Sequence, residues 1–371
     1  MKSGIDQEKI PVVAALSGGV DSSVAAALLV EQGYDVTGVM LKLWAEKRCP
    51  GGGCGINRCC TPESVNRAHD VAEQLGIPFR LIDVQEEFKE AVVDTFVAEY
   101  AAGRTPCPCV PCNRTIRFGF LLDLALRSGA EFMATGHYAR IQQNGEHHRL
   151  LRGVDPQKDQ SYFLHILGQR QLAHVLFPLG ELTKPQVREI ARERGLPVAD
   201  QPDSQDLCFL ATTDYRDFLA QRVPDLFTPG PIRDTQGRIL GEHQGLPAYT
   251  IGQRRGLNVT SAGSTAKPLY VVEIVAEENT LIVGTWEELA FTTCLVDAMH
   301  TINGETPREP FRADAQIRSQ AAPTTVTVTP LSEQRIRVDF DEPQRSVTPG
   351  QFLVLYRGEE TLGGGVILPQ R

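Results

Sequence analysis

The 371-residue sequence has no apolar run near the roughly 20 residues that a bilayer-spanning helix needs, so a membrane segment is excluded. Residues Met1–Asp6 also lack an apolar signal segment, and we expect a cytoplasmic protein. Internal repeats and low-complexity stretches are missing as well. The composition, 42% hydrophobic and 22% charged, is that of ordinary globular protein, and the length predicts two or three domains.

The most informative segment is Ser17–Ser23, which follows the apolar run Pro11–Leu16. Its two adjacent glycines predict a tight turn between a strand and a helix, close to a ligand. The helix start and the three serine hydroxyls favour a phosphate or pyrophosphate there. No Lys follows the glycines, which excludes the Lys-containing phosphate loop of phosphoryl-transfer enzymes. Asp21 suits this site if a Mg²⁺ ion is shared with the phosphates. A serine-capped turn alone would need fewer of these groups.

Strand-like and helix-like segments alternate in the first half of the chain, which predicts a parallel sheet covered on both faces. Ligands of such sheets bind outside the carboxyl ends of the strands. The expected strands are 12–16, 35–43, 79–84 and 132–135, and the expected helices are 22–31, 63–75, 88–102 and 116–128.

The pattern changes near Pro202, where glycine and proline become frequent after an expected helix at 214–222. Short strands follow, and Thr324–Thr329 and Arg335–Phe340 alternate with period two, as half-buried antiparallel strands do. We therefore predict an α/β protein with an N-terminal doubly wound parallel sheet, a small central domain and a C-terminal antiparallel β-barrel. The expected domains are residues 1–210, 211–285 and 286–371.

Nine cysteines in a cytoplasmic protein indicate metal, cluster or sulfur chemistry rather than structural disulfides. Cys107, Cys109 and Cys112 lie within Thr105–Asn113, where prolines should exclude helix and hold the thiols on a stiff loop. The next helix should start near Asn113, and thiols at a helix start have lowered pKa values. Cys208 follows much later, in a polar segment.

Several motifs together make the sequence similar to the tRNA-specific 2-thiouridylases, which belong to the PP-loop ATP pyrophosphatases. The resemblance runs from the first strand to about Ile274 and is weaker through the barrel. The residues that carry it are Ser17–Ser23, Thr105–Asn113, Ala134–Tyr138, Lys158–Tyr162, Asp203–Phe209 and Tyr249–Gly256.

The resemblance implies a tRNA-uridine 2-sulfurtransferase. ATP and Mg²⁺ would be held by Ser17–Ser23, and O2 of the wobble uridine would be adenylated with release of pyrophosphate. A persulfide on Cys208 would then deliver sulfur to C2, and Cys112 would release the product by forming a disulfide with Cys208. The implied partners are tRNAs of the Lys, Glu and Gln type and a sulfur-donor protein.

One motif departs from the family, because Cys107-Pro108-Cys109 replaces the Asn-Pro-Asp of many members. Proton transfer by an acid at position 109 is therefore not expected. The replacement creates a third thiol, and Cys109, Cys112 and Cys208 could hold a 4Fe–4S cluster with one iron open to a sulfide. A cluster-borne sulfur and a Cys208 persulfide remain alternatives.

The resemblance also suggests binding residues, although the net charge of −9 gives no general affinity for nucleic acid. His137 is expected near the nucleotide. Each proposed tRNA contact could instead be a solvated surface group. The expected nucleotide residues are Ala15, Leu16, Ser17, Gly18, Gly19, Val20, Asp21, Ser22, Ser23, Leu41 and Gly136. The expected tRNA contacts are Cys107, Pro108, Cys109, Lys158, Asp159, Gln160, Arg254, Arg255 and Arg318.

Two other functions remain open: a different PP-loop ATP-dependent synthetase, which needs no thiols, and a non-catalytic cysteine-rich RNA-binding or redox module. A second cysteine group does not match the paired spacing of zinc sites and is expected in a loop near the active site. Cys294 is expected in the barrel core. The second group comprises Cys49, Cys54, Cys59 and Cys60.

Overall fold

The structure is a computed structural model that describes residues 9–44, 61–202, 207–210, 214–257, 259 and 267–369. The chain forms two compact units, and each is treated by itself below. The first unit comprises residues 1–91 and 110–212, and the second comprises residues 92–109 and 213–371. Both the predicted central and C-terminal domains fall in the second unit, and the predicted division at residues 210 and 285 stays a prediction.

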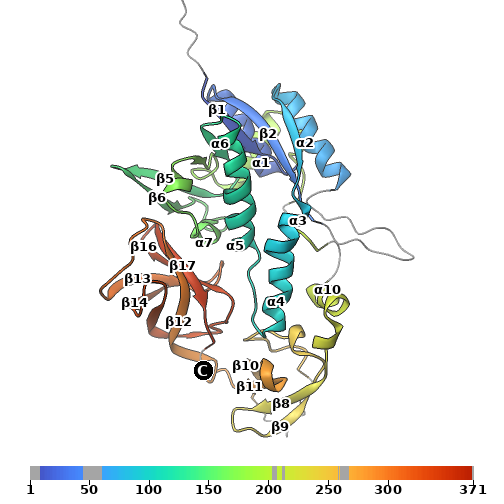
Figure 1. The fold of residues 1–371 in the computed structure, drawn as a ribbon, viewed down its shortest axis with the longest axis vertical. Coiled ribbons are helices and arrows are strands. Elements are labelled where there is room, and N and C mark those ends of the chain that lie inside the picture. The colour runs from blue at the N-terminus through green and yellow to red at the C-terminus, as the bar shows by residue number, and fades with distance from the viewer. Residues whose placement is uncertain are drawn as a thin grey trace, which may run out of the picture. The chain divides into compact units, whose positions relative to one another are not determined.

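The first unit is built on a parallel sheet with the strand order β3-β2-β1-β4-β7. This confirms the sheet predicted from the alternation of strand-like and helix-like segments. Its neighbouring strands β1 and β2 are labelled in Figure 1. The strands are β1 (Pro11–Ala15), β2 (Asp35–Lys42), β3 (Phe79–Asp83), β4 (Phe132–Ala134) and β7 (Val175–Leu176).

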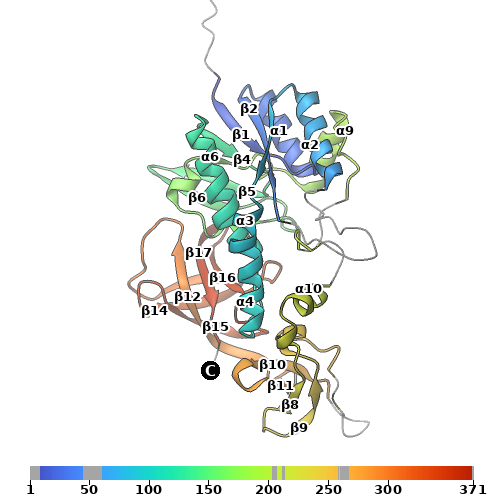
Figure 2. The ribbon, with the colours of Figure 1, turned by 45° about the vertical axis from the view of Figure 1, so that its right-hand side comes forward.

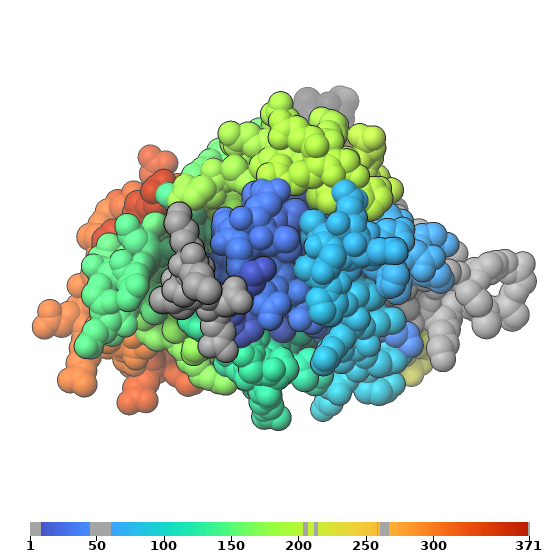
Figure 3. All heavy atoms as spheres, turned by 90° about the horizontal axis from the view of Figure 1, so that it is seen from above, coloured from blue at the N-terminus to red at the C-terminus, as the bar shows by residue number. Residues whose placement is uncertain are grey.

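Helices cover both faces of this sheet, with α1 and α2 on one side and α6 on the other (Figure 2). Alternate residues of β1 join α1 and α2 in one apolar core that includes Leu16, Leu29 and Met40. A neighbouring core joins α1 to α9, whose segment lies beside the N-terminal residues in Figure 3. The bounds are α1 (Val20–Glu31), α2 (Pro62–Leu75), α6 (Leu122–Arg127) and α9 (Lys184–Glu193).

Shorter elements complete this part of the chain. Gly76 ends α2 in the left-handed conformation, with φ of 67°, as a C-terminal cap should. A hairpin that the sequence did not predict is formed by β5 (Ala139–Asn144) and β6 (His147–Arg152). The remaining helices of this unit are α3 (Gln85–Phe88), α7 (Ser161–Leu164) and α8 (Gln169–Leu172). The π-helical η1 (Lys89–Asp94) ends in the second unit, to which α4 (Thr95–Ala101) belongs.

The cysteine–proline segment corrects one prediction. We expected no helix before Asn113, but Cys109–Pro111 is already helical (α5) and continues into the π-helical η2 (Cys112–Leu121). Proline is compatible with the first turn of a helix, because the N–H that it lacks would have no helical partner there. Cys112 therefore lies inside a helical segment rather than on a loop.

The second unit contains two antiparallel-rich sheets. The smaller has the order β10-β11-β8-β9 and follows α10 (Tyr215–Arg222), which Asp214 caps. Its strands are β8 (Gly230–Asp234), β9 (Ile239–His243), β10 (Tyr270–Val275) and β11 (Thr280–Gly284), with 3-10 turns η3 (Pro224–Leu226), η4 (Leu246–Ala248) and η5 (Ala276–Glu278).

The larger sheet closes into the predicted β-barrel, in the order β12-β15-β14-β13-β16-β17 with β17 pairing back to β12. Inward-facing residues of β14 and β15, such as Val326 and Val338, form its core together with Cys294. Burial raises the pKa of the Cys294 thiol to about 12. None of the described helices is long and apolar enough to cross a membrane. The strands are β12 (Ala290–Thr301), β13 (Phe311–Gln316), β14 (Thr324–Pro330), β15 (Ile336–Arg345), β16 (Phe352–Arg357) and β17 (Glu360–Ile367).

Candidate active site

The turn between β1 and α1 depends on its first glycine. Gly18 has φ of 71°, and a Cβ there would lie 2.3 Å from the Ser64 carbonyl oxygen, so a side chain cannot be accommodated. Gly19 precedes the first residue of α1 in an extended conformation. The turn therefore brings the start of α1 to the carboxyl end of β1, where its N–H groups can meet an anion.

The serine hydroxyls do not all point the same way. Ser17 and Ser22 lie together, with 3.0 Å between their Oγ atoms, and the Ser17 backbone N–H donates to Ser22 Oγ. Ser23 is fully buried, and its hydroxyl donates to the Gly19 carbonyl at 2.8 Å. Val20 packs in the apolar core. The Ser22 hydroxyl also donates to the Gly19 carbonyl, at the longer distance of 3.2 Å. A ligand at Ser17 and Ser22 therefore competes with this weaker bond, whereas Ser23 and Val20 hold the turn together.

A cavity of about 280 Å³ opens beside this turn, and every residue that lines it belongs to the first unit. Its size suits part of a small-molecule ligand. It brings together one face of the turn, the ends of β1 and β2 and two cysteines. The predicted nucleotide and sulfur residues on its wall are Ala15, Leu16, Ser17, Asp21, Ser22, Leu41, Gly136, Cys112 and Cys208.

Asp21 has partners that the sequence did not reveal. Lys184 Nζ lies 2.7 Å from Asp21 Oδ1 and 2.8 Å from Oδ2, and the Tyr138 hydroxyl donates to Oδ1 at 2.7 Å. Lys184 is separated from Asp21 by 163 residues and carries no local motif. Asp21 is the single carboxylate among the lining residues, all of which are described, and it is engaged by the protein itself.

Gly136 and His137 close the cavity next to the turn. A Cβ on Gly136 would lie 2.8 Å from the backbone carbon of Asp21, so this glycine is required for packing against α1. Burial, and then the charge of Arg117, lowers the pKa of His137 to about 3. Its Nδ1 lies 2.7 Å from Thr135 Oγ1. His137 is therefore a neutral wall of the cavity at pH 7 and not a cation.

The two thiols on the cavity come from distant parts of the chain. Cys112 is buried in η2, and Cys208 is half-buried beside Phe209, whose ring packs on Phe88 at 6.2 Å. No disulfide joins them, nor any of the other cysteines in the described ranges, which are Cys107, Cys109 and Cys294.

Two other predicted cysteines are not among the described residues that line this cavity. Cys107 and the exposed Cys109 belong to the second unit, together with Pro108. Cys49, Cys54, Cys59 and Cys60 lie outside the described residues, as do Asp203 to Asp206.

The predicted tRNA contacts of the first unit have different surroundings. The Asp159 carboxylate accepts from Arg152 at 2.9 Å, from Ser161 Oγ at 2.8 Å and from two backbone N–H groups, so it holds its own loop. Gln160 lines the cavity and accepts from the Tyr138 backbone N–H. Lys158 is half-buried.

In the second unit, Arg254 and Arg255 are exposed on a turn that Gln253 ties down through bonds to Thr250 and to the Arg255 carbonyl. Arg318 is half-buried. Its guanidinium donates to the Ser346 carbonyl at 2.8 Å and to Thr348 Oγ1 at 3.0 Å, which supports Ser346 at φ of 58°. These bonds give Arg318 a structural task within the barrel.

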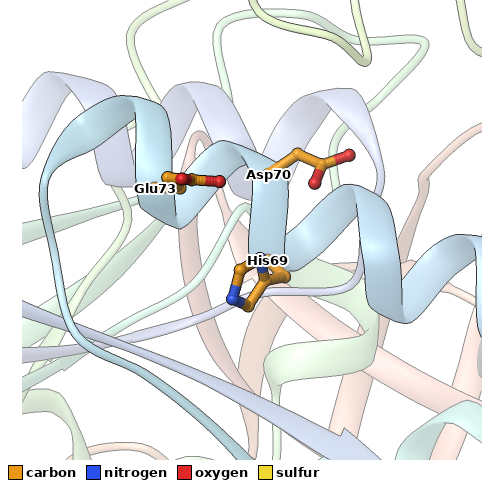
Figure 4. A group of neighbouring side chains, drawn as sticks. All are labelled: His69, Asp70 and Glu73. Atoms are coloured by element: carbon orange, nitrogen blue, oxygen red, sulfur yellow. The ribbon is translucent and has the colours of Figure 1, made fainter.

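One further group of possible metal ligands lies on the surface of α2. His69, Asp70 and Glu73 are exposed, and their ligand atoms lie within 4.8 Å of one another (Figure 4). Such exposed groups are common on helix surfaces, and no other described residue points to an ion there.

The fold and the cavity define an α/β protein with an anion-binding turn at the carboxyl ends of its parallel strands and two thiols beside that turn. Three family models match the chain. Residues 10–212 match the tRNA methyl transferase HUP domain, residues 216–285 match the tRNA methyl transferase PRC-barrel domain, and residues 291–367 match the aminomethyltransferase β-barrel domain. Two relatives are named tRNA-specific 2-thiouridylase MnmA. The protein of Roseiflexus castenholzii is 46% identical, covering 96% of this chain and 98% of its own. That of Carboxydothermus hydrogenoformans is also 46% identical, covering 96% and 97%. The chain belongs to the family of tRNA-specific 2-thiouridylases.

A solved structure, the U34-tRNA thiolase NcsA from Methanococcus maripaludis with its 4Fe–4S cluster, is similar to a lesser degree. It is 18% identical, covers 59% of this chain and 66% of its own, and has a TM-score of 0.32. This likeness is too slight to carry an argument about the site.

Proposed function

We propose that this protein uses ATP to replace O2 of the tRNA wobble uridine with sulfur. The observation that carries the proposal is a single cavity lined by the anion-binding turn (Ser17, Asp21, Ser22) and by Cys112 and Cys208. The names of the relatives support the same activity. Methyl transfer, which the family-model description mentions, explains neither the turn nor a second thiol.

The turn would activate the uridine. Ser17, Ser22 and the N–H groups at the start of α1 hold the phosphates of ATP. The uridine O2 attacks the α-phosphorus, the bond to the β-phosphate oxygen breaks, and pyrophosphate leaves. The base is now an O-adenylate, and AMP is a far better leaving group than the original oxygen. The turn and the two thiols line a cavity, so the target base must leave its stack to reach them.

The thiols would then carry out the substitution. The terminal sulfur of a Cys208 persulfide attacks C2, and AMP leaves with the C2–O2 bond electrons. The Cys112 thiolate attacks Cys208 Sγ, the S–S bond breaks, and its electrons stay on the sulfur attached to C2. The products are 2-thiouridine and a Cys112–Cys208 disulfide, which a cellular dithiol must reduce before the next turnover.

An iron–sulfur cluster would be held by Cys109, Cys112 and Cys208, and it would supply an iron-bound sulfide in place of the persulfide. The structure supports two of these ligands on one cavity wall, and the donor set is of the right chemical kind. Mg²⁺ fits the protein less well, because the Asp21 carboxylate is occupied by Lys184 and Tyr138. We therefore assign Mg²⁺ no protein ligand in this cavity.

We further propose that the substrates are tRNAs of the Lys, Glu or Gln type, that a donor protein supplies the sulfur, and that the reaction takes place in the cytoplasm. Lys158, Gln160, Arg254 and Arg255 are the residues that we propose to contact tRNA, and salt should weaken that binding strongly. Cys107, Pro108, Cys109 and Arg318 stay weaker candidates. Asp159 contributes by holding its loop rather than by reaching RNA.

The decisive experiment incubates the purified protein with ATP, Mg²⁺, a sulfide or persulfide donor and unmodified tRNA, followed by nucleoside analysis. We expect 2-thiouridine in the wild type and none in Cys112→Ala or Cys208→Ala. No 2-thiouridine in the wild type, together with pyrophosphate release that both variants retain in full, would indicate a thiol-independent synthetase. Absence of tRNA-dependent pyrophosphate release would indicate a non-catalytic module. Retained activity in anaerobically purified protein without visible cluster absorbance favours the persulfide.

A further inference from the structure

Two helices of the first unit are joined at both ends by ion pairs. At their N-terminal ends Lys184 of α9 binds Asp21 of α1, and at their C-terminal ends Arg194, just after α9, binds Glu31. The first pair is the more buried one: the side chains of Lys184 and Asp21 are 11% and 37% exposed, and those of Arg194 and Glu31 are 26% and 51% exposed. The two pairs also differ in position, because Asp21 lines the cavity and Glu31 does not.

Lys184 is held in place from several sides. It is the first residue of α9, whose start is stabilised by a bond from the Thr183 N–H to Gln186 Oε1 at 2.8 Å. The Lys184 backbone N–H donates to Asp155 Oδ2 at 2.9 Å. The ammonium group therefore reaches Asp21 from a backbone that is itself fixed, so the pair loses little side-chain entropy when it forms.

The charge of Asp21 makes this pair significant for a phosphate site. A bare carboxylate on the cavity wall would repel the phosphates of ATP, and the start of α1 could not fully offset it. Such a carboxylate needs a cation, supplied either by a bound metal or by the protein. Here both carboxylate oxygens accept from one lysine, and Oδ1 accepts from Tyr138 as well.

We propose that Lys184 is a positioning residue of the nucleotide site: it neutralises Asp21 and anchors the start of α1, so that Mg²⁺ enters with the phosphates of ATP and not on Asp21. The proposal rests on the nucleotide-binding part of the proposed function. In this proposal the Asp21 carboxylate forms a salt bridge with Lys184 and does not bind a metal.

The test measures binding of α,β-methylene-ATP by calorimetry, without tRNA or a sulfur donor. The variants are Lys184→Met, Lys184→Arg, Asp21→Asn, the double variant Lys184→Met/Asp21→Asn, and Arg194→Met as the matched control on the same two helices. Thermal unfolding is recorded for each.

We expect Lys184→Met to weaken binding about tenfold or more, because it leaves an unpaired carboxylate beside the phosphates. Lys184→Arg and Arg194→Met should stay within about threefold of the wild type. Adding Asp21→Asn to Lys184→Met should restore most of the lost affinity, since the repelling charge is gone. Raising Mg²⁺ should rescue Lys184→Met, whose Asp21 becomes available to the metal, and should leave the wild type unchanged at saturation.

Three results would overturn the proposal: wild-type affinity in Lys184→Met, no recovery in the double variant, or equal Mg²⁺ dependence of Lys184→Met and wild type. If Lys184→Met does not fold, Lys184→Arg and the double variant carry the test, and weak binding by both then counts against it. Failure of the wild type to bind the analogue would instead refute nucleotide binding itself, and thus the proposed function.

Discussion

Positive charge is used differently in the two units. In the first unit Lys184 is buried against Asp21, and the half-buried Arg117 lines the cavity beside Cys112 and His137. In the second unit Arg254 and Arg255 stand exposed on a surface turn. A buried cation with fixed partners acts on its immediate neighbours, and salt screens it little. Exposed cations attract a polyanion from a distance and are strongly screened. The first arrangement suits chemistry on one phosphate or base, and the second suits recognition of a long RNA.

The largest expected effect comes from a substitution that removes sulfur transfer and leaves tRNA binding intact. We expect Cys208→Ser to reduce 2-thiouridine formation by about a thousandfold or more, because the substitution removes the thiol that would carry the persulfide or bind the cluster. Binding of tRNA and tRNA-dependent pyrophosphate release should persist. Nucleoside analysis and a pyrophosphate assay on the same preparation measure both steps. Loss of pyrophosphate release together with thiolation would show that Cys208 is also needed for adenylation.

Gly136→Ala should damage the cavity without changing any charge. The added Cβ would meet the backbone of Asp21 at 2.8 Å, so the start of α1 must move. We expect nucleotide affinity to fall about tenfold to a hundredfold, by analogy with other overpacked sites. The control is Gly129→Ala, where φ is 89° but no atom lies within 4 Å. It should lower stability and leave nucleotide affinity unchanged, and equal effects of both variants would refute the interpretation.

Because His137 is buried and neutral, we expect the free energy of unfolding of the first unit to depend on pH. Its pKa is lowered to about 3 by burial, so the unfolded chain binds a proton below about pH 6.5 that the folded chain does not. The stabilisation from His137 is complete above that pH and is lost as pH falls toward 3. At pH 4.5 the loss is about 3 kcal/mol. Urea unfolding between pH 7 and 4.5 should show a weaker pH slope in His137→Gln than in the wild type, and identical slopes would contradict this account.

The exposed arginines Arg254 and Arg255 should affect the affinity for tRNA and its salt dependence. We expect Arg254→Gln/Arg255→Gln to weaken tRNA binding about tenfold and to lower the slope of log K against log salt by about 1.5. Arg238→Gln is the control, since Arg238 is 72% exposed in the same unit and pairs with Asp234. Filter binding at several salt concentrations measures both quantities. An unchanged slope would mean that the two arginines do not meet phosphate.

Substitution of Arg318 tests whether this half-buried arginine binds RNA, as we propose for Arg254 and Arg255, or stabilises the barrel. Its guanidinium bonds to Ser346 and Thr348 predict that Arg318→Met destabilises the protein by about 1–3 kcal/mol and leaves the salt slope of tRNA binding unchanged. Denaturant unfolding combined with filter binding distinguishes the two roles. A lowered salt slope with unchanged stability would place Arg318 at the RNA instead.

Much of the fold could be predicted because its signals are local. The apolar run before Ser17, the glycine that ends α2 and the alternation of β14 and β15 each reflect the backbone and burial of neighbouring residues. The hairpin β5–β6 and the early start of α5 were missed. In those places tertiary packing decides between conformations that single residues leave open.

The turn at Ser17–Ser23 could be predicted from local sequence, since the need for glycine at φ of 71° and for hydroxyls at a helix start is met within a few residues. The sequence also indicated that thiols accompany this turn, through motifs that resemble one family. The resemblance already paired Cys112 with Cys208, and both line one cavity, but the contact of Lys184 with Asp21 across 163 residues depends on tertiary packing alone. The reason is that α9 reaches α1 by burying Val187 and Ala191 in a shared core, and no local pattern around residue 184 specifies that contact.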